Sequence, residues 1–142
     1  MNKKATVHKS YCPINLSLEI IGDKWTLIII RDIMMVGKRS FRELLKSDEK
    51  IATNILSSRL TMLEERGIIT KKKDASHKQK NIYSLTKMGI DLFPILMDIG
   101  VWALAHLPVD KKSTEHLKML LDGGEKKQKE FLEDLKKVHL SV

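Results

Sequence analysis

Small polar side chains gather on one face of a helix that the sequence predicts near the middle of the chain. Leu56, Leu60 and Leu63 form a single apolar stripe along residues 53–66. At 100° per residue, the opposite face and its flank carry Thr53, Asn54, Ser57, Ser58 and Arg59. Asn can make two hydrogen bonds to adenine, and Ser or Thr can bond bases or phosphates. The face could therefore contact DNA, although Ser and Asn also decorate helices that meet only solvent.

A second cluster, rich in lysine, lies between two short apolar segments that follow this helix. Residues 71–80 contain five lysines and a single acidic residue, Asp74. The basic side chains of the cluster are Lys71, Lys72, Lys73, His77, Lys78 and Lys80. Such a cluster can lie along a phosphate backbone or enter the minor groove. Lysine also keeps exposed strand edges soluble, which is the simpler alternative.

Other basic residues are weaker candidates for phosphate contact. Lys38 and Arg39 precede a short predicted helix, and Arg42 lies within it. Arg59 flanks the leucine stripe, where it could form a structural bridge as easily as it could bind phosphate.

The lone cysteine, Cys12, precedes a proline that we expect to begin a helix. The positive end of the helix dipole stabilises a thiolate and lowers the thiol pKa, and the nearby His8 and Lys9 favour the same form. A thiolate is the form that reacts with oxidants and with electrophiles such as aldehydes. The common alternative is that a lone cysteine is a small buried hydrophobic residue.

Capping signals delimit the elements that must hold these side chains in place. Asp23 can cap the second helix, and Ser40 with Glu43 forms a capping box for the third. Gly67 suits the left-handed residue that ends the fourth, and Pro94 is expected to bend the fifth. We expect helices over residues 13–21, 24–35, 41–46, 53–66 and 87–107, with a short strand on either side of the basic cluster.

The order of helix, strand, basic hairpin, strand and helix is that of a winged helix. The predicted fold class is mainly α with a small β-hairpin wing (α+β), a winged helix-turn-helix with additional N- and C-terminal dimerisation helices. We expect a flexible N-terminal arm at residues 1–10, the winged helix-turn-helix DNA-binding domain at residues 11–107, and a C-terminal helical extension at residues 108–142.

The composition is that of a globular chain with a basic surface. The 142 residues are 31% charged and 42% hydrophobic, with a formal net charge of +8. Basic excess favours phosphates or anionic membranes, although many soluble proteins carry such a charge without binding either. We expect no membrane span, because no apolar run approaches about 18 residues, and no secretion signal. One cysteine permits no internal disulfide, and the expected location is the cytoplasm, at the nucleoid.

Nothing in the sequence favours an enzyme. The five histidines, His8, His77, His106, His116 and His139, have no metal-ligand spacing. A glycine-rich phosphate loop and a nucleophile motif are also missing. We therefore expect neither catalysis nor a cofactor or metal.

Six motifs, in order, carry a resemblance to a known family. They are Cys12-Pro13, Ile21-Gly22-Asp23-Lys24-Trp25-Thr26-Leu27, Phe41-Arg42-Glu43-Leu44, Ile55-Leu56-Ser57-Ser58-Arg59-Leu60, Leu63-Glu64-Glu65-Arg66-Gly67-Ile68 and Tyr83-Ser84-Leu85-Thr86-Lys87-Met88-Gly89. Over about residues 11–105 the chain resembles the HxlR family of bacterial transcription regulators, a winged-helix group related to the MarR-type regulators. The resemblance implies a dimer that binds promoter DNA. It also implies a sensing role for Cys12, because the Cys-Pro cysteine of several relatives senses oxidants or reactive aldehydes, while other members keep it with no known signal.

The chain departs from the family pattern in three places. The turn before the fourth helix usually carries Pro-Gly, where this chain has Glu49-Lys50. The usual Ser or Thr cap of that helix is replaced by Ala52, although Thr53 could cap one residue later. The wing lacks its usual proline and is richer in lysine, so we expect a more mobile wing that depends more on charge.

An apolar surface on the fifth helix predicts a homodimer, because a patch of this size is difficult for one small domain to cover. The predicted interface residues are Leu96, Ile99, Trp102, Phe131 and Leu135. In a twofold dimer, two recognition helices would meet successive major grooves about 34 Å apart on a palindromic operator in double-stranded DNA. The alternative is that these stripes are buried within their own domain.

The sequence therefore favours a DNA-binding transcription regulator of the HxlR type, with Cys12 as a candidate site for a small oxidant or aldehyde. The alternative is a winged helix used for protein contact without sequence-specific DNA binding. The lysines disfavour that alternative, because protein interfaces are poor in lysine.

Overall fold

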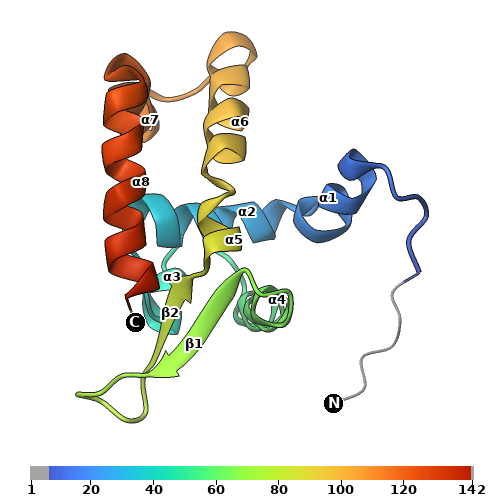
Figure 1. The fold of residues 1–142 in the computed structure, drawn as a ribbon, viewed down its shortest axis with the longest axis vertical. Coiled ribbons are helices and arrows are strands. Elements are labelled where there is room, and N and C mark those ends of the chain that lie inside the picture. The colour runs from blue at the N-terminus through green and yellow to red at the C-terminus, as the bar shows by residue number, and fades with distance from the viewer. Residues whose placement is uncertain (1–6, 142) are drawn as a thin grey trace.

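The chain folds into helices that surround one short β-hairpin (Figure 1). The computed structural model describes residues 7–141, and residues 1–6 of the expected N-terminal arm lie outside the described residues. The elements in order are α1 (Pro13–Ile21), α2 (Lys24–Arg31), the π-helical turn η1 (Asp32–Val36), α3 (Phe41–Leu44), α4 (Thr53–Glu65), β1 (Ile69–Lys73), β2 (Asn81–Leu85), α5 (Lys87–Ile90), α6 (Phe93–His106), α7 (Lys111–Asp122) and α8 (Gly124–Leu140). The fold is a winged helix-turn-helix with additional helices at both ends, as predicted.

Local capping produces the helix-turn-helix segment. Asp23 caps α2 by accepting hydrogen bonds from the N–H groups of Trp25 and Thr26. Ser40 and Glu43 form the predicted capping box at the start of α3. The helix predicted over residues 24–35 is present, but it passes from α-helical to π-helical hydrogen bonding in η1.

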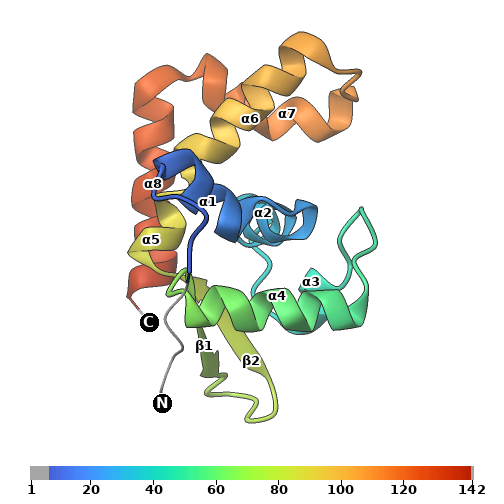
Figure 2. The same cartoon turned by 90° about the vertical axis from the view of Figure 1, so that its right-hand side faces the viewer.

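The core lies between α2, α4, the base of the hairpin and the C-terminal helices. Leu56, Leu60 and Leu63 form the predicted stripe of α4, and each is at most 3% exposed. Other buried core side chains are Ile29, Ile30, Ile33, Leu44, Ile68, Ile69, Leu85, Ile90, Phe93, Met97, Leu120 and Leu135. Because α4 buries only this stripe, its polar side faces outward. Figure 2 shows α4 lying across the molecule, with the hairpin below it and α6 and α7 above.

The wing is an antiparallel pair of strands, with Ile69 opposite Leu85. Gly67 ends α4 with a positive φ of 75°, and this left-handed residue reverses the chain directly into β1. Only the base of the hairpin is buried, at Ile69 on β1 and from Tyr83 to Leu85 on β2. The wing therefore has an anchored base and an exposed outer part.

The predicted long fifth helix is two helices, which corrects the expectation that Pro94 bends a continuous one. Thr86 caps α5 by accepting a hydrogen bond from the N–H of Gly89, but the chain leaves the helix before α6 begins at Phe93. Pro94 lies in the first turn of α6, where its missing N–H interrupts no helical hydrogen bond. The helix therefore restarts at the proline.

The stretch Lys87–His106 qualifies the expectation that no apolar run approaches the length of a membrane span. An 18-residue window within these 20 residues has a mean hydropathy of 1.6, which is enough by length and composition alone. Asp91 and Asp98 interrupt it, and the break between α5 and α6 falls at Asp91. One such helix is weak evidence for a span.

The C-terminal helices fold back over the domain, and α8 contacts α5, α7 and β2. Phe131 packs on Phe93 with ring centroids 5.3 Å apart, and Leu135 is only 6% exposed. Gly100 lets α7 approach α6, because a Cβ there would lie 2.6 Å from Leu117 Cδ2. Phe131 and Leu135, which the sequence placed at a dimer interface, are thus packed within their own chain because α8 returns to the core.

Charge pairing builds the turn before α4, where the resemblance leads one to expect Pro-Gly. Arg31 donates two hydrogen bonds of 2.8 and 2.7 Å to Glu49, and two more to the buried carboxylate of Asp32. The hydrogen bonds from Arg31 lower the pKa of Glu49 to about 2, against the opposing effect of burial. Lys50 follows with a φ of +59°, a left-handed conformation that glycine adopts more readily.

Replacing Lys50 with glycine should stabilise the fold. An L-residue in the left-handed region is strained by about 1 kcal/mol relative to glycine. Allowing for the greater freedom of glycine in the unfolded chain, we expect Lys50→Gly to raise the free energy of unfolding by about 0.5 kcal/mol. Chemical denaturation measures this change. Lys129→Gly, inside α8, is the control and should lower the free energy by about 1 kcal/mol. A Lys50→Gly protein less stable than the wild type would contradict the assigned strain.

Candidate nucleic-acid interface

The small polar residues predicted to contact DNA lie on the exposed side of α4. Thr53, Asn54, Ser57 and Ser58 are all exposed and occupy the first two turns. Ala52 holds the N-cap position without a side-chain hydrogen bond, so Thr53 is the first helical residue and does not cap the helix. The first turn therefore keeps N–H donors that an external acceptor such as a phosphate could use.

The basic residues of the wing are exposed along its outer part, because neither face of the projecting hairpin is covered. They are Lys71, Lys72 and Lys73 on β1 and His77, Lys78 and Lys80 in the loop. Asp74 shapes this loop by accepting hydrogen bonds from the N–H and the hydroxyl of Ser76. Asp74, the acidic residue within the cluster, thus stabilises the conformation of the loop.

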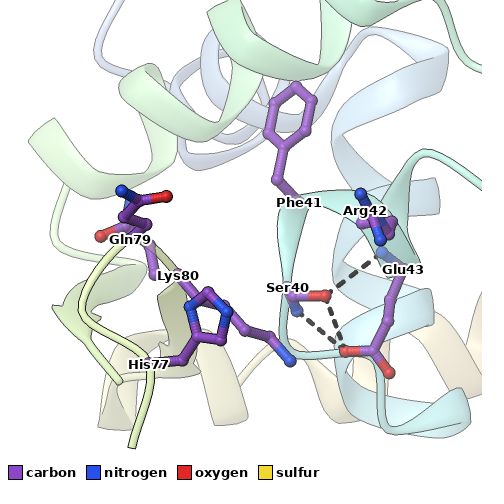
Figure 3. A pocket seen from close by; sticks show the side chains of 8 residues that line it. Ser40, Phe41, Arg42, Glu43, His77, Gln79 and Lys80 are labelled. Carbon is purple, nitrogen blue, oxygen red and sulfur yellow. Dashed lines mark hydrogen bonds between the residues drawn. The ribbon is translucent and has the colours of Figure 1, made fainter. Parts of the chain in front are cut away.

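A hollow of about 720 Å³ separates the start of α3 from the wing. Figure 3 shows His77 and Lys80 extending from the wing toward Ser40 and Glu43, which are hydrogen-bonded to each other. The lining residues are Ser40, Phe41, Arg42, Glu43, His77, Gln79, Lys80 and Asn81. The sequence did not identify Gln79 and Asn81 as candidate site residues. The only feature of the sequence that could have indicated them is their position next to the lysines.

A smaller hollow of about 120 Å³ joins the polar side of α4 to the wing. Ser57 and Thr61 line it from α4, and Lys71 lines it from β1. Lys71 also approaches Glu64 at 3.9 Å, a separation at which an exposed ion pair contributes little. The fold therefore brings the polar helix face and the basic strand together at one surface.

Two of the weaker phosphate candidates are bound within the chain. Lys38 donates a 3.2 Å hydrogen bond to Asp32 and is only 18% exposed at its side chain. Arg39 donates from Nε to the Tyr83 carbonyl at 2.7 Å and from Nη2 to the Ser84 hydroxyl at 2.6 Å. These donors brace the scaffold and do not belong to the exposed basic surface.

Arg59 forms a bridge between helices, which is the structural alternative considered from the sequence. Its Nε donates to Asp23 Oδ2 at 2.9 Å and so ties α4 to the start of α2. Although burial opposes it, hydrogen bonds from Thr26 and Arg59 keep the pKa of Asp23 below its ordinary value. Arg42, in contrast, is exposed beside the larger hollow.

Cys12 occupies the N-cap position of α1, with Pro13 as the first helical residue, as predicted. The thiol is exposed, so it is not the buried hydrophobic residue of the alternative hypothesis. Hydrogen bonds from the backbone N–H groups of Asn15 and Ile14 lower the pKa of the thiol. His8, expected to favour the thiolate, pairs with Glu19.

Exposed apolar side chains on α6 form a surface that we call the apolar face. Its members are Ile95, Ile99 and Trp102, which are between 37% and 59% exposed, and α1 separately exposes Ile14 and Leu18. The α6 residues border a shallow hollow of about 400 Å³. Leu96, in contrast, packs partly buried against the core. The sequence assigned the N-terminal helix to dimerisation but identified none of its individual residues.

Comparison with known proteins identifies the family. The sequence model of the HxlR-like helix-turn-helix family matches residues 20–111. An HTH-type transcriptional regulator of Mycobacterium tuberculosis is 35% identical over 95 residues, which cover 67% of this chain and 59% of that protein. The chain therefore matches about three fifths of the length of that relative.

Solved structures give the same result. PA1607, assigned as a transcription factor, is 34% identical with a TM-score of 0.65, and the match covers 72% of this chain and 70% of that one. The reduced form of the redox regulator HypR is 31% identical with a TM-score of 0.58, over 66% of this chain and 92% of HypR. The chain belongs to the HxlR-like helix-turn-helix family of transcriptional regulators.

Proposed function

We propose that the protein is a homodimeric transcription regulator that binds a palindromic operator in double-stranded DNA. The observation that carries the proposal is the exposed small-polar side of α4 beside an exposed lysine-rich wing. A helix of this kind fits the major groove, about 12 Å wide, while a wing follows the neighbouring phosphate backbone or enters the minor groove. The net charge of +8 favours the same partner. Such a regulator acts in the cytoplasm, at the nucleoid.

The two elements have different tasks in this proposal. Asn54 and Ser57, in the first turns of α4, meet base edges and determine which sequence is bound. The lysines of the wing, with Arg42, supply affinity that depends little on sequence, because each neutralised phosphate releases counterions. Arg59 supports this surface by holding α4 against Asp23.

A second copy of the chain is the proposed cover of the apolar face. An exposed patch of this kind marks an interface, and in a twofold dimer the face meets its own copy. The opposite side of α6 already packs against α7 of the same chain, where Gly100 leaves room for the side chain of Leu117. The twofold axis would present two α4 helices to successive major grooves about 34 Å apart.

Cys12 is proposed to make the regulator responsive to oxidants or electrophiles. Its exposure, its lowered pKa and the similarity of the chain to the redox regulator HypR support this role. A thiolate that attacks peroxide takes one oxygen atom and becomes a sulfenic acid, while the peroxide is reduced to water. In this proposal α1, which exposes Ile14 and Leu18, packs across the twofold axis, so modification at its first turn would disturb the dimer.

Changing Lys71, Lys72 and Lys73 to alanine should weaken binding to all DNA sequences by a similar factor. Losing three phosphate contacts per protomer should reduce the slope of log K against log salt by about 2 to 3 for each protomer. Fluorescence anisotropy titrations over a range of salt concentrations, with an operator selected from random DNA, measure both effects.

Two further variants distinguish the effect of charge on affinity from the recognition of DNA sequence. Changing Lys126, Lys127 and Lys129 to alanine removes the same charge from the start of α8, far from the wing (Figure 1), and should leave the slope nearly unchanged. Asn54→Ala should change the preference between the operator and its base-substituted variants by about fivefold or more. If the wing variant and Asn54→Ala both bind like the wild type, α4 and the wing are not the DNA-binding elements.

Trp102→Glu should convert the dimer into a monomer, because a carboxylate would be buried in the apolar face without a partner. Sedimentation at micromolar concentration checks the mass. Val138→Glu, at an exposed apolar position on α8, is the matched control and should remain dimeric. A wild-type protein that sediments as a monomer would rule out the dimer.

Peroxide, diamide or an aldehyde should alter the DNA affinity of the wild type but not that of Cys12→Ser. Titrations before and after treatment, followed by a thiol reductant, test whether the change is present and reversible. Equal responses of the two proteins would exclude Cys12 as the sensor.

A further inference from the structure

Residues from outside the hairpin hold one edge of strand β2. Backbone groups of a strand point alternately to its two sides, and β1 occupies only one of them. On the other side, the N–H of Tyr83 donates to the Arg39 carbonyl at 2.8 Å. The N–H of Leu85 donates to Nδ1 of His139 at 3.0 Å. The base of the wing is therefore attached both to the loop before α3 and to the last turn of α8.

The contact between Leu85 and His139 is buried, with the two residues 1% and 4% exposed. A buried backbone N–H needs an acceptor, because leaving it unpaired costs more than the hydrogen bond contributes. His139 can accept at Nδ1 only when that nitrogen carries no proton. Burial and the positive charge of Arg39 lower the pKa of His139 to about 4, so the neutral form prevails near pH 7.

His139 belongs to a part of the chain that the family model does not match, since that model ends at residue 111. Figure 1 shows the C-terminal end of α8 meeting the base of the hairpin. Arg39 also holds strand β2, because its side chain donates hydrogen bonds to the Tyr83 carbonyl and the Ser84 hydroxyl. Together the two side chains fix β2 from a side that the hairpin itself leaves open.

We propose that His139 is a positioning residue for DNA binding, through which the C-terminal extension sets the angle of the wing. This role rests on the proposed function. A two-stranded hairpin has little stability of its own, so its direction depends on what holds its base. The turn at Gly67 fixes the position of β1 relative to α4, while Arg39 and His139 fix the position of β2. Without the acceptor at residue 139, the outer part of the wing would sample directions in which its lysines miss the phosphates.

Amide hydrogen exchange of the free protein tests the attachment independently of DNA. His139→Leu keeps the bulk of the side chain but removes the acceptor, and should speed exchange along β2 by about tenfold or more. The amides of Leu56, Leu60 and Leu63 should keep their wild-type rates. His139→Asn, whose Oδ1 stands close to the position of Nδ1, should restore slow exchange. Unchanged exchange in β2 of His139→Leu would overturn the proposal.

DNA titrations of the full chain test the positioning role. His139→Leu should weaken operator binding by about fivefold, and His139→Asn should recover most of that loss. In the background without Lys71, Lys72 and Lys73, His139→Leu should have a clearly smaller effect, because only Lys78 and Lys80 of the wing lysines remain to be positioned. An equal loss in both backgrounds would mean a general structural role and would overturn the proposal.

The same titrations distinguish failure of this inference from failure of the proposed function. If the wild type does not bind DNA, the proposed function and the positioning role fail together. If the wild type binds and its wing lysines matter, but His139→Leu binds equally well, only the positioning role fails. Should His139→Leu not fold, His139→Gln takes its place, because its longer side chain displaces the acceptor from Leu85.

Discussion

Burial of the leucine stripe of α4 is the constraint on which the rest of the structure depends. Leu56, Leu60 and Leu63 cover only a narrow strip of the helix, and all three are buried. Once that strip faces the core, geometry places the small polar residues on the outside. The same packing sets the wing, because α4 ends at Gly67 and the chain returns at once to bury Ile68 and Ile69 against the same core. The proposed DNA surface is thus a consequence of how the core is filled.

The basic residues divide according to what holds them. Arg31, Arg39 and Arg59 each make hydrogen bonds to acceptors from other elements, and these bonds fix the helix-turn-helix and the base of the wing. The planar guanidinium suits such bridges, because its donors have a fixed direction. The lysines of the wing remain exposed, and a flexible, hydrated ammonium suits a phosphate backbone that it need not meet at one fixed angle. Formal charge is therefore a poor guide to which basic residue is free to meet a phosphate.

The C-terminal extension covers one side of α6 and leaves the other side exposed. One side receives α7 at Gly100, and α8 brings Phe131 and Leu135 into the core. The other side remains exposed and forms the apolar face. Because the extension also reaches β2 through His139, it links the face proposed for a second protomer with the wing proposed for DNA. The α7–α8 helix pair thereby contacts both α6 and the base of the wing.

The sequence by itself determined the features that depend on near neighbours. The capping box at Ser40, the N-cap at Asp23 and the stripe of α4 involve residues at most a few turns apart, and all were predicted correctly. The family also followed from short motifs in order. The tertiary structure alone decided that Leu135 is buried, that Arg39 and Arg59 act as bridges, and that His139 holds the wing. Those partners are separated by 36 to 54 positions in the chain for Arg59 with Asp23, Arg39 with Tyr83 and His139 with Leu85, so periodicity and capping carry no information about them. Only the packing of distant segments brings each donor to its acceptor.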